Sequence, residues 1–146
     1  MYLLDTNIVS ADAPTKRPVG MEAFAAWMRA NSDRLYLSAI TVAEIEAGIA
    51  RAARIGATAK AWKIRRWLST VEHFYAGRIL PFGIEEARHA GMILDRARAH
   101  GPGFEDIGIA ATAAAHALTV LTANERHFEP LGVPLANPLK RLPSTQ

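Results

Sequence analysis

The sequence predicts an α/β domain built on a central, mostly parallel sheet of four to five strands flanked by helices. Short β-like apolar runs alternate with longer segments of helical periodicity, which is typical of parallel sheets connected by helices. The chain has 146 residues, half of them hydrophobic, which is enough for one core and too few for a second domain. We therefore expect a single domain over residues 1–138 and a C-terminal tail over residues 139–146.

Four apolar runs are the candidate strands, at residues 2–4, 35–40, 79–82 and 118–121. A fifth short strand is expected at residues 133–136. Pro134 would confine that strand to an edge of the sheet, because proline lacks the N–H group that a central strand donates.

Apolar residues recur at helical spacing between these strands. Two such sets predict amphipathic helices joined near Gly56: Val42, Ile45, Ile49 and Ala52 in the first, and Ile64, Trp67, Leu68, Val71, Phe74 and Tyr75 in the second. Three further helices are expected at residues 19–30, 84–99 and 107–117, the last of them rich in alanine. Residues 12–18, with two prolines and two basic residues, are expected to form a surface loop.

The composition excludes several classes of site. The chain has no cysteine, which excludes disulfides, thiol catalysis and thiolate zinc sites. A net charge of +3 suits an anionic partner without identifying one.

No apolar stretch reaches the about 18 residues that a membrane span needs, and the first residues lack a leader pattern. We therefore expect a cytoplasmic protein that does not enter the membrane.

Three carboxylates, Asp5, Glu44 and Asp106, stand where a predicted strand or loop gives way to a helix. Because the carboxyl ends of parallel strands share one edge of a sheet, we expect the three to share a crevice. At about 5 Å separation, two carboxylates repel by about 3 kcal/mol in an effective dielectric of about 20. Oxygen ligands without cysteine or clustered histidine favour Mg²⁺ or Mn²⁺ over Zn²⁺ as the compensating cation.

Each acid also has a simpler interpretation as a helix cap. Asp5 could cap a short helix, Thr41 followed by Glu44 matches the reciprocal capping box, and Asp106 could be the residue that caps the alanine-rich helix. The residues alone leave both interpretations open.

Four segments, in order along the chain, resemble the successive motifs of a PIN domain, and in particular those of the VapC toxins of bacterial type II toxin-antitoxin modules. They are Leu3-Leu4-Asp5-Thr6-Asn7, Ser38-Ala39-Ile40-Thr41-Val42-Ala43-Glu44, Asp106-Ile107-Gly108-Ile109-Ala110-Ala111-Thr112-Ala113 and Leu121-Thr122-Ala123-Asn124-Glu125-Arg126-His127-Phe128. The resemblance extends from Met1 to about Pro138.

This resemblance implies a metal-dependent endoribonuclease toxin that cleaves RNA phosphodiesters, is inhibited by a cognate VapB-type antitoxin, and usually forms a homodimer. It implies that Asp5, Glu44 and Asp106 are the catalytic acids and hold Mg²⁺ or Mn²⁺. The resemblance further implies that neighbouring polar side chains orient the acids or the attacking water. These are Thr6, Asn7 and Ser38, together with Thr122 and Asn124 of a Thr-x-Asn turn.

The chain departs from the family pattern at one position. Many such toxins carry a further Asp three residues after the Asn of that turn, where this chain has His127. Three acids suffice for one ion, but the sequence leaves a second metal site open. His127 could be a weak ligand, a phosphate contact or a surface residue, and the last is the interpretation we favour at this level.

A basic stretch with interleaved tryptophans is the second candidate binding feature. We expect Arg51, Arg54, Trp62, Arg65 and Arg66, together with His127, to contact RNA or the antitoxin, because cations grip phosphates and aromatic planes stack on bases. Trp67 lies on the apolar stripe and is expected in the core, whereas Trp62 lies off it. The alternative is an ordinary solvated face.

Two other functions compete with the nuclease interpretation. A PIN-like module that has lost activity would bind RNA or protein without cleaving RNA. His127, at the position of the further acid, is the reason to consider this alternative. An aspartyl phosphatase of the haloacid dehalogenase type would use Asp5 as its nucleophile. Such enzymes need a second Asp two residues later, and this chain has Asn7 there, which disfavours them.

Overall fold

The computed structural model describes residues 1–11, 13 and 21–144. All but one residue of the loop expected at 12–18, and the first two residues of the helix expected at 19–30, lie outside the described residues. No helix within the described ranges is long and apolar enough to cross a membrane.

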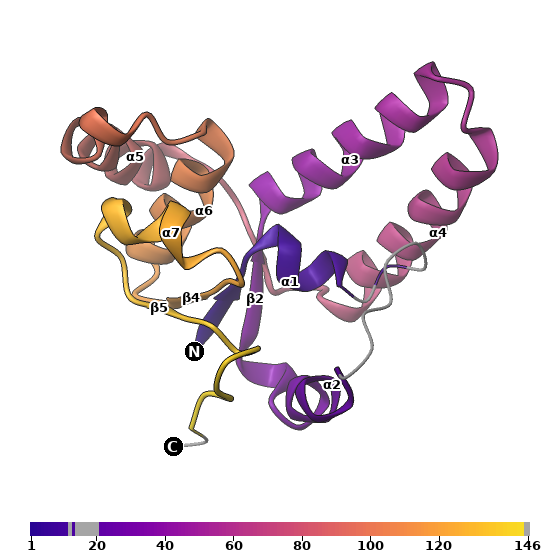
Figure 1. Ribbon diagram of the computed structural model, residues 1–146, viewed down its shortest axis with the longest axis horizontal. Coiled ribbons are helices and arrows are strands. Elements are labelled where there is room, and N and C mark those ends of the chain that lie inside the picture. The colour runs from indigo at the N-terminus through magenta and orange to yellow at the C-terminus, as the bar shows by residue number, and fades with distance from the viewer. Residues whose placement is uncertain (12, 14–20, 145–146) are drawn as a thin grey trace.

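Five parallel strands form the sheet in the order β3-β2-β1-β4-β5, which confirms the predicted architecture (Figure 1). The strands are β1 (Tyr2–Leu4), β2 (Leu35–Ser38), β3 (Ile79–Leu80), β4 (Thr119–Leu121) and β5 (Leu135–Ala136). β1 is central and pairs with β2 on one side and β4 on the other. β5 lies at an edge, as Pro134 requires.

Four predicted strands are shorter than expected: β4 and β5 begin one and two residues late, and β2 and β3 end early. The strand predicted at 35–40 ends at Ser38, because the Ser38 hydroxyl accepts the Ile40 N–H at 3.1 Å and starts a helix there. The strand predicted at 79–82 ends before Pro81, which has no N–H to donate to a neighbour.

Alternating side chains of the strands divide the core into two layers. Leu3 and Val120 face one layer, which α5 (Ile84–Arg96), α6 (Phe104–Ala115) and α7 (Glu125–Phe128) cover. Leu4 and Leu121 face the other layer, formed with α1 (Thr6–Ser10), α2 (Glu22–Ala30) and the last turns of α4 (Thr58–Phe74). The sheet is thereby covered on both faces, as all-parallel sheets are.

Helices α3 (Ala39–Arg54) and α4 form the predicted amphipathic pair, joined through Gly56 at a φ of 81°. Phe74, expected on the apolar stripe, is instead exposed at the end of α4, whereas the next residue, Tyr75, is buried. Figure 1 shows that this hairpin extends beyond the sheet, and that among the described elements no other helix lies beside its far end. The hairpin has a small core of its own, composed of Ile45, Ile49, Ala52, Ala61 and Leu68.

Arg78, just before β3, joins three segments of the chain. Its guanidinium group donates to the carbonyl oxygens of Ser32, Leu35 (2.8 Å) and Phe74 (2.7 Å). It also lies over the ring of Tyr75, 5.0 Å from its centroid. These contacts tie the end of α4 to the beginning of β2.

The described part of the C-terminal segment, residues 139–144, runs back along the domain. The indole N–H of Trp27 donates to the Pro143 carbonyl at 3.0 Å, and the Lys140 ammonium group pairs with Glu125.

A cavity of about 330 Å³ lies between α1, α2 and α4 and is lined mainly by apolar side chains, among them Phe24 and Trp67.

Candidate active site

The acidic crevice, the neighbourhood of Asp5, Glu44 and Asp106, lies where the order of the strands changes direction. β1 is followed by β2 on one side of the sheet and has β4 on its other side, so the connections after β1 and β4 leave in opposite directions. Asp5 directly follows β1 and Thr122 directly follows β4. Open parallel sheets bind their ligands at such a switch point, outside the carboxyl ends of the strands.

Asp5 is held at this point by its neighbours across the switch. The Thr122 hydroxyl donates to Asp5 Oδ2 at 2.7 Å and accepts the Asn124 N–H at 2.9 Å. Asp5 is only 5% exposed, and this burial raises the pKa of its carboxyl. The negative charge of Asp106 raises that pKa further, whereas the Thr122 hydroxyl and the Thr6 N–H lower it. Asp5 precedes α1, but its side chain makes no capping hydrogen bond there.

Glu44 faces the same crevice from the second turn of α3. Burial raises the pKa of Glu44, and so do the negative charges of Asp5, Glu105 and Asp106, while the Thr6 hydroxyl lowers it. The capping-box interpretation is wrong, because Ser38 caps α3 and places Glu44 inside the helix.

Asp106 enters the crevice from the first turn of α6. The helix begins at Phe104, three residues before the predicted start, with Gly103 at the N-cap, so Asp106 is not the capping residue. Its Oδ2 lies 3.0 Å from Nδ1 of His127 on α7. The interpretation of His127 as a plain surface residue is therefore wrong, although the ring remains exposed.

The predicted supporting residues mostly hold the elements that carry the acids. Ser38 is fully buried, caps α3 and shares a 2.9 Å hydrogen bond with Thr112 of α6. Thr6 contacts Asp5 through its backbone, and its hydroxyl lies 3.2 Å from Oγ1 of Thr41 and bonds Glu44. Asn7 Oδ1 accepts the Ala123 N–H at 3.3 Å, which joins α1 to the turn after β4.

Two further glutamates, Glu125 and Glu105, lie within or beside the motifs and have different surroundings. Glu125 is bonded to Lys140 and to Asn137, which lowers its pKa, so it is engaged away from the crevice and does not replace a fourth acid. Glu105 was not among the acids predicted from the sequence, yet its negative charge raises the pKa of Glu44. Its position next to Asp106 in the first turn of α6 is the feature that could have indicated this.

The carboxylates influence one another electrostatically without converging on a single point. Within residues 1–11, 13 and 21–144, no three His, Asp or Glu side chains are already grouped as ligands of one ion. An ion at this crevice would therefore rest on one or two carboxylates and on water, which is how Mg²⁺ is commonly held.

Comparison with known proteins identifies the family. The family model of the PIN domain matches residues 2–132 of this chain. The chain belongs to the PIN-domain family. This PIN domain is 37% identical over 141 residues to Toxin FitB of Neisseria gonorrhoeae, covering 94% of this chain and 98% of that protein. It is also 37% identical over 143 residues to VapC ribonuclease Y4jK of Sinorhizobium fredii, covering 94% and 97%. The crystal structure of FitAcB from Neisseria gonorrhoeae superposes with a TM-score of 0.78 at 36% identity, covering 95% of this chain and 99% of that one.

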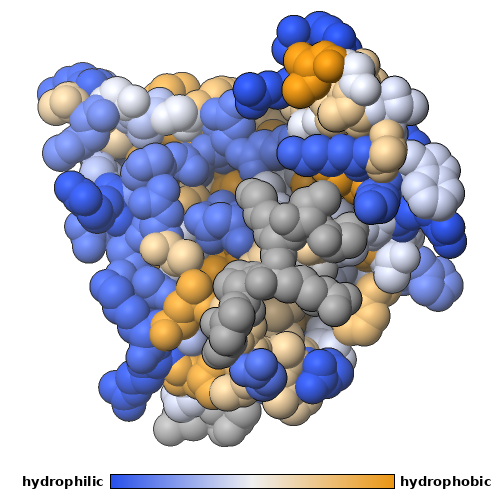
Figure 2. All heavy atoms as spheres, turned by 45° about the vertical axis from the view of Figure 1, so that its right-hand side comes forward, coloured by the Kyte–Doolittle hydropathy of each residue, from blue (hydrophilic) through white to orange (hydrophobic). Residues whose placement is uncertain are grey.

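The far end of the α3–α4 hairpin of this PIN domain is cationic. Between residues 50 and 66 the chain has six Lys or Arg residues and no Asp or Glu, and all six cations are exposed. In Figure 2 this end lies at the upper right of the view, where hydrophilic side chains surround a small exposed hydrophobic patch. One cation, Arg65, is paired with Glu46 at 3.0 Å.

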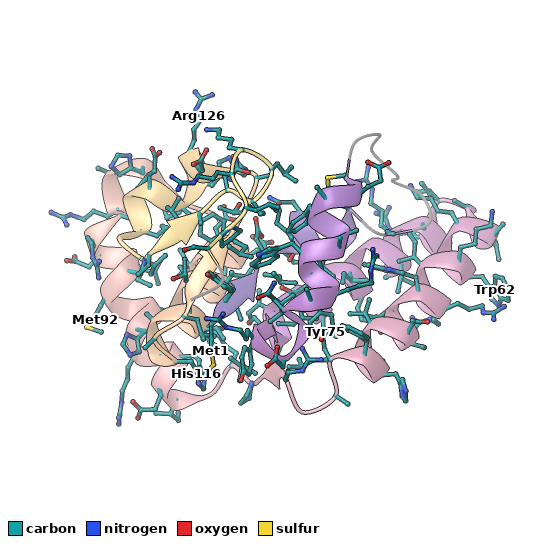
Figure 3. The ribbon with its side chains drawn as sticks, turned by 90° about the horizontal axis from the view of Figure 1, so that it is seen from below. Met1, Trp62, Tyr75, Met92, His116 and Arg126 are labelled. Atoms are coloured by element: carbon teal, nitrogen blue, oxygen red, sulfur yellow. The ribbon has the colours of Figure 1, made fainter. Side chains whose placement is uncertain are left out.

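The two tryptophans of the hairpin have different environments. Trp67 is partly buried and packs against two core clusters, which confirms the expectation for that residue. Trp62 is 58% exposed, and Figure 3 shows it at the outer edge of α4, pointing away from the domain. The guanidinium group of Arg66 lies 4.8 Å from the centroid of its ring.

Proposed function

We propose that this PIN domain is a divalent-metal-dependent endoribonuclease toxin, which hydrolyses RNA phosphodiester bonds and is inhibited by a cognate VapB-type antitoxin. The observation that carries the proposal is the buried Asp5 at the strand switch point, with Asp106 close enough to raise the pKa of both Asp5 and Glu44. Relatives named as a toxin and as a VapC ribonuclease match nearly the whole chain, which supports the same assignment.

The donor set of the crevice fits Mg²⁺ or Mn²⁺. Asp5, Asp106 and Glu44 offer only carboxylate oxygens, which hard divalent cations prefer. Burial and mutual repulsion raise the pKa of both Asp5 and Glu44, so a cation there would relieve an electrostatic cost that the fold already carries. Such an ion supplies a bound water of lowered pKa and stabilises negative charge on the phosphoryl oxygens.

The side chains of the crevice orient the catalytic carboxylates and the attacking water. Thr122 and Thr6 orient the Asp5 carboxylate through hydrogen bonds, which favour its ionised form and oppose the rise in its pKa that burial causes. Asp5 or Asp106 would align the attacking water with the phosphorus. The attacking water gives one proton to the aligning carboxylate as its oxygen forms the new P–O bond, the bond to the departing ribose oxygen breaks, and that ribose oxygen takes up a proton from solvent.

An antitoxin would inhibit the site most directly through a positive side chain. Related proteins have been solved as FitAB and VapBC complexes bound to DNA. A basic residue inserted among Asp5, Glu44 and Asp106 would offset their repulsion in place of a metal ion. We also propose a homodimer, as the family resemblance implies.

We further propose that the hairpin binds the RNA strand that enters the crevice. Arg51, Arg54 and Arg66 are exposed cations, and Trp62 presents an exposed ring beside Arg66. Stacking of one base on an aromatic side chain contributes about 1–3 kcal/mol. Trp62→Ala should therefore weaken RNA binding, whereas Ile55→Ala, which removes an exposed aliphatic side chain at the hairpin tip, should not. Arg65, already paired with Glu46, should contribute less than Arg66.

The decisive experiment is cleavage of total bacterial RNA by purified, antitoxin-free protein with Mg²⁺, with Mn²⁺ and with chelator. Asp106→Asn is expected to reduce cleavage by at least about a hundredfold. Glu72→Gln, on the exposed face of α4, is the matched charge control and should cleave normally. Metal-independent RNA binding without cleavage by the native protein would overturn the nuclease proposal in favour of a non-catalytic RNA-binding module.

A further inference from the structure

His127 occupies the rim of the acidic crevice and contacts one acid directly. Its Nδ1 lies 3.0 Å from Asp106 Oδ2, and its charge, when present, lowers the pKa of Asp5. The exposed imidazole therefore lies in contact with Asp106 and close enough to Asp5 to act on its charge.

The direction of this hydrogen bond follows from the chemistry of the acceptor. An ionised carboxylate can only accept, so the proton of the bond must be on Nδ1. In the neutral ring this leaves the lone pair on Nε2. The two ring nitrogens thus have different tasks, and only Nδ1 is engaged with Asp106.

The backbone around His127 is held firmly enough to aim the ring. Phe128, the next residue, is fully buried in the core layer that α6 shares. The His127 N–H donates to the Asn124 carbonyl at 3.1 Å, and the Asn124 N–H donates to the Thr122 hydroxyl that bonds Asp5. One continuous chain of contacts therefore connects Asp5, through the turn after β4, to Asp106.

We propose that His127 is a positioning residue, which fixes the Asp106 carboxylate in the crevice by donating from Nδ1. The inference rests on the proposed nuclease function. A donor at this position adds no negative charge to the crevice and supplies a hydrogen bond that orients an acid already there. Groups that orient a ligating side chain in this way typically affect metal affinity or activity by about 10- to 100-fold.

Two amide substitutions separate the ring nitrogens. The side-chain nitrogen of His127→Asn can take the place of Nδ1, whereas that of His127→Gln reaches the place of Nε2. We expect His127→Asn to keep kcat within about threefold, and His127→Gln and His127→Ala to lose about 10- to 100-fold with KM for RNA unchanged. Mn²⁺ affinity, measured by calorimetry without RNA, should follow the same order.

Two controls separate a positioning effect on Asp106 from a general effect of altering this surface. Arg126→Ala, at the neighbouring exposed position of α7, should leave kcat and Mn²⁺ affinity unchanged. In an Asp106→Asn background, His127→Gln should have no further effect on Mn²⁺ affinity, because the carboxylate to be positioned is gone.

Equal losses in His127→Asn and His127→Gln would overturn the positioning role, and so would a loss confined to KM, which would indicate a phosphate contact. Full cleavage by Asp106→Asn would instead refute the proposed nuclease site itself. The two failures are therefore distinguishable.

Discussion

Asp5→Asn should make the metal-free protein more stable while abolishing cleavage. The substitution keeps the shape of the side chain and keeps an oxygen that can accept the Thr122 hydroxyl. It removes a buried negative charge whose pKa is raised by desolvation and by Asp106. The free energy of unfolding should therefore increase, because the native state no longer carries the cost of that charge.

The magnitude follows from the burial of Asp5 and from its retained hydrogen bond. Asp5 is 5% exposed, so solvent screens its charge little. Relief of a destabilised functional position typically stabilises by about 0.5–2 kcal/mol. In a domain of this size each kcal/mol raises Tm by about 2–4 °C, so we expect an increase of about 1–8 °C.

Thermal unfolding in chelator, measured as a function of pH, tests the cause as well as the effect. A raised native-state pKa means that the folded protein binds the proton more tightly, so the Asp5 cost is fully present above that pKa. The cost is lost as pH falls from the raised pKa toward the ordinary value of 3.8. The difference in Tm between Asp5→Asn and the native protein should therefore be largest near neutral pH and vanish in acid.

Adding Mn²⁺ should reverse the order of stability. At about a hundred times its Kd, a ligand of the native state adds about 2.7 kcal/mol, and Asp5→Asn should gain much less than the native protein. Glu72→Gln should follow the native protein under every condition. An Asp5→Asn variant less stable than the native protein in chelator at neutral pH would refute the reasoning, because it would show that the Asp5 charge stabilises the fold.

Three further substitutions test packing and hydrogen bonding. Gly108→Ala should lower the free energy of unfolding by about 1–3 kcal/mol, because its Cβ would lie 2.8 Å from Cγ1 of Ile40 where α6 crosses α3. In urea unfolding, the double variant with Ile40→Ala should lose less stability than the sum of the two single losses. Arg78→Lys should lower Tm, since an ammonium group cannot reproduce the planar fork that meets three backbone carbonyls. Thr122→Val removes the hydroxyl that lowers the pKa of Asp5, so the acid limb of the cleavage profile should move to higher pH; an unchanged profile would show that Asp5 ionisation does not control it.

Elements with strong periodicity could be predicted from the sequence, and their exact ends could not. The α3–α4 hairpin and its Gly56 joint follow from apolar spacing that depends on the helix alone. The start of α3 was misjudged because Thr41 and Glu44 match a capping box as well as an interior turn does. Ser38 decided the matter through a bond to Ile40. The early start of α6 likewise depended on Gly103, which carries no side-chain capping signal.

The sequence by itself determined the fold class, the order of the motifs and the three acids, because alternation, helical spacing and residue type are local properties of the chain. Only the tertiary structure decided which groups share the crevice. Thr122 meets Asp5 across 117 positions, His127 meets Asp106 across 21, and Glu105 acts on Glu44 from another helix. Those pairings depend on the parallel order of the strands and on the crossing of α3 and α6 at Gly108, and no local pattern encodes either.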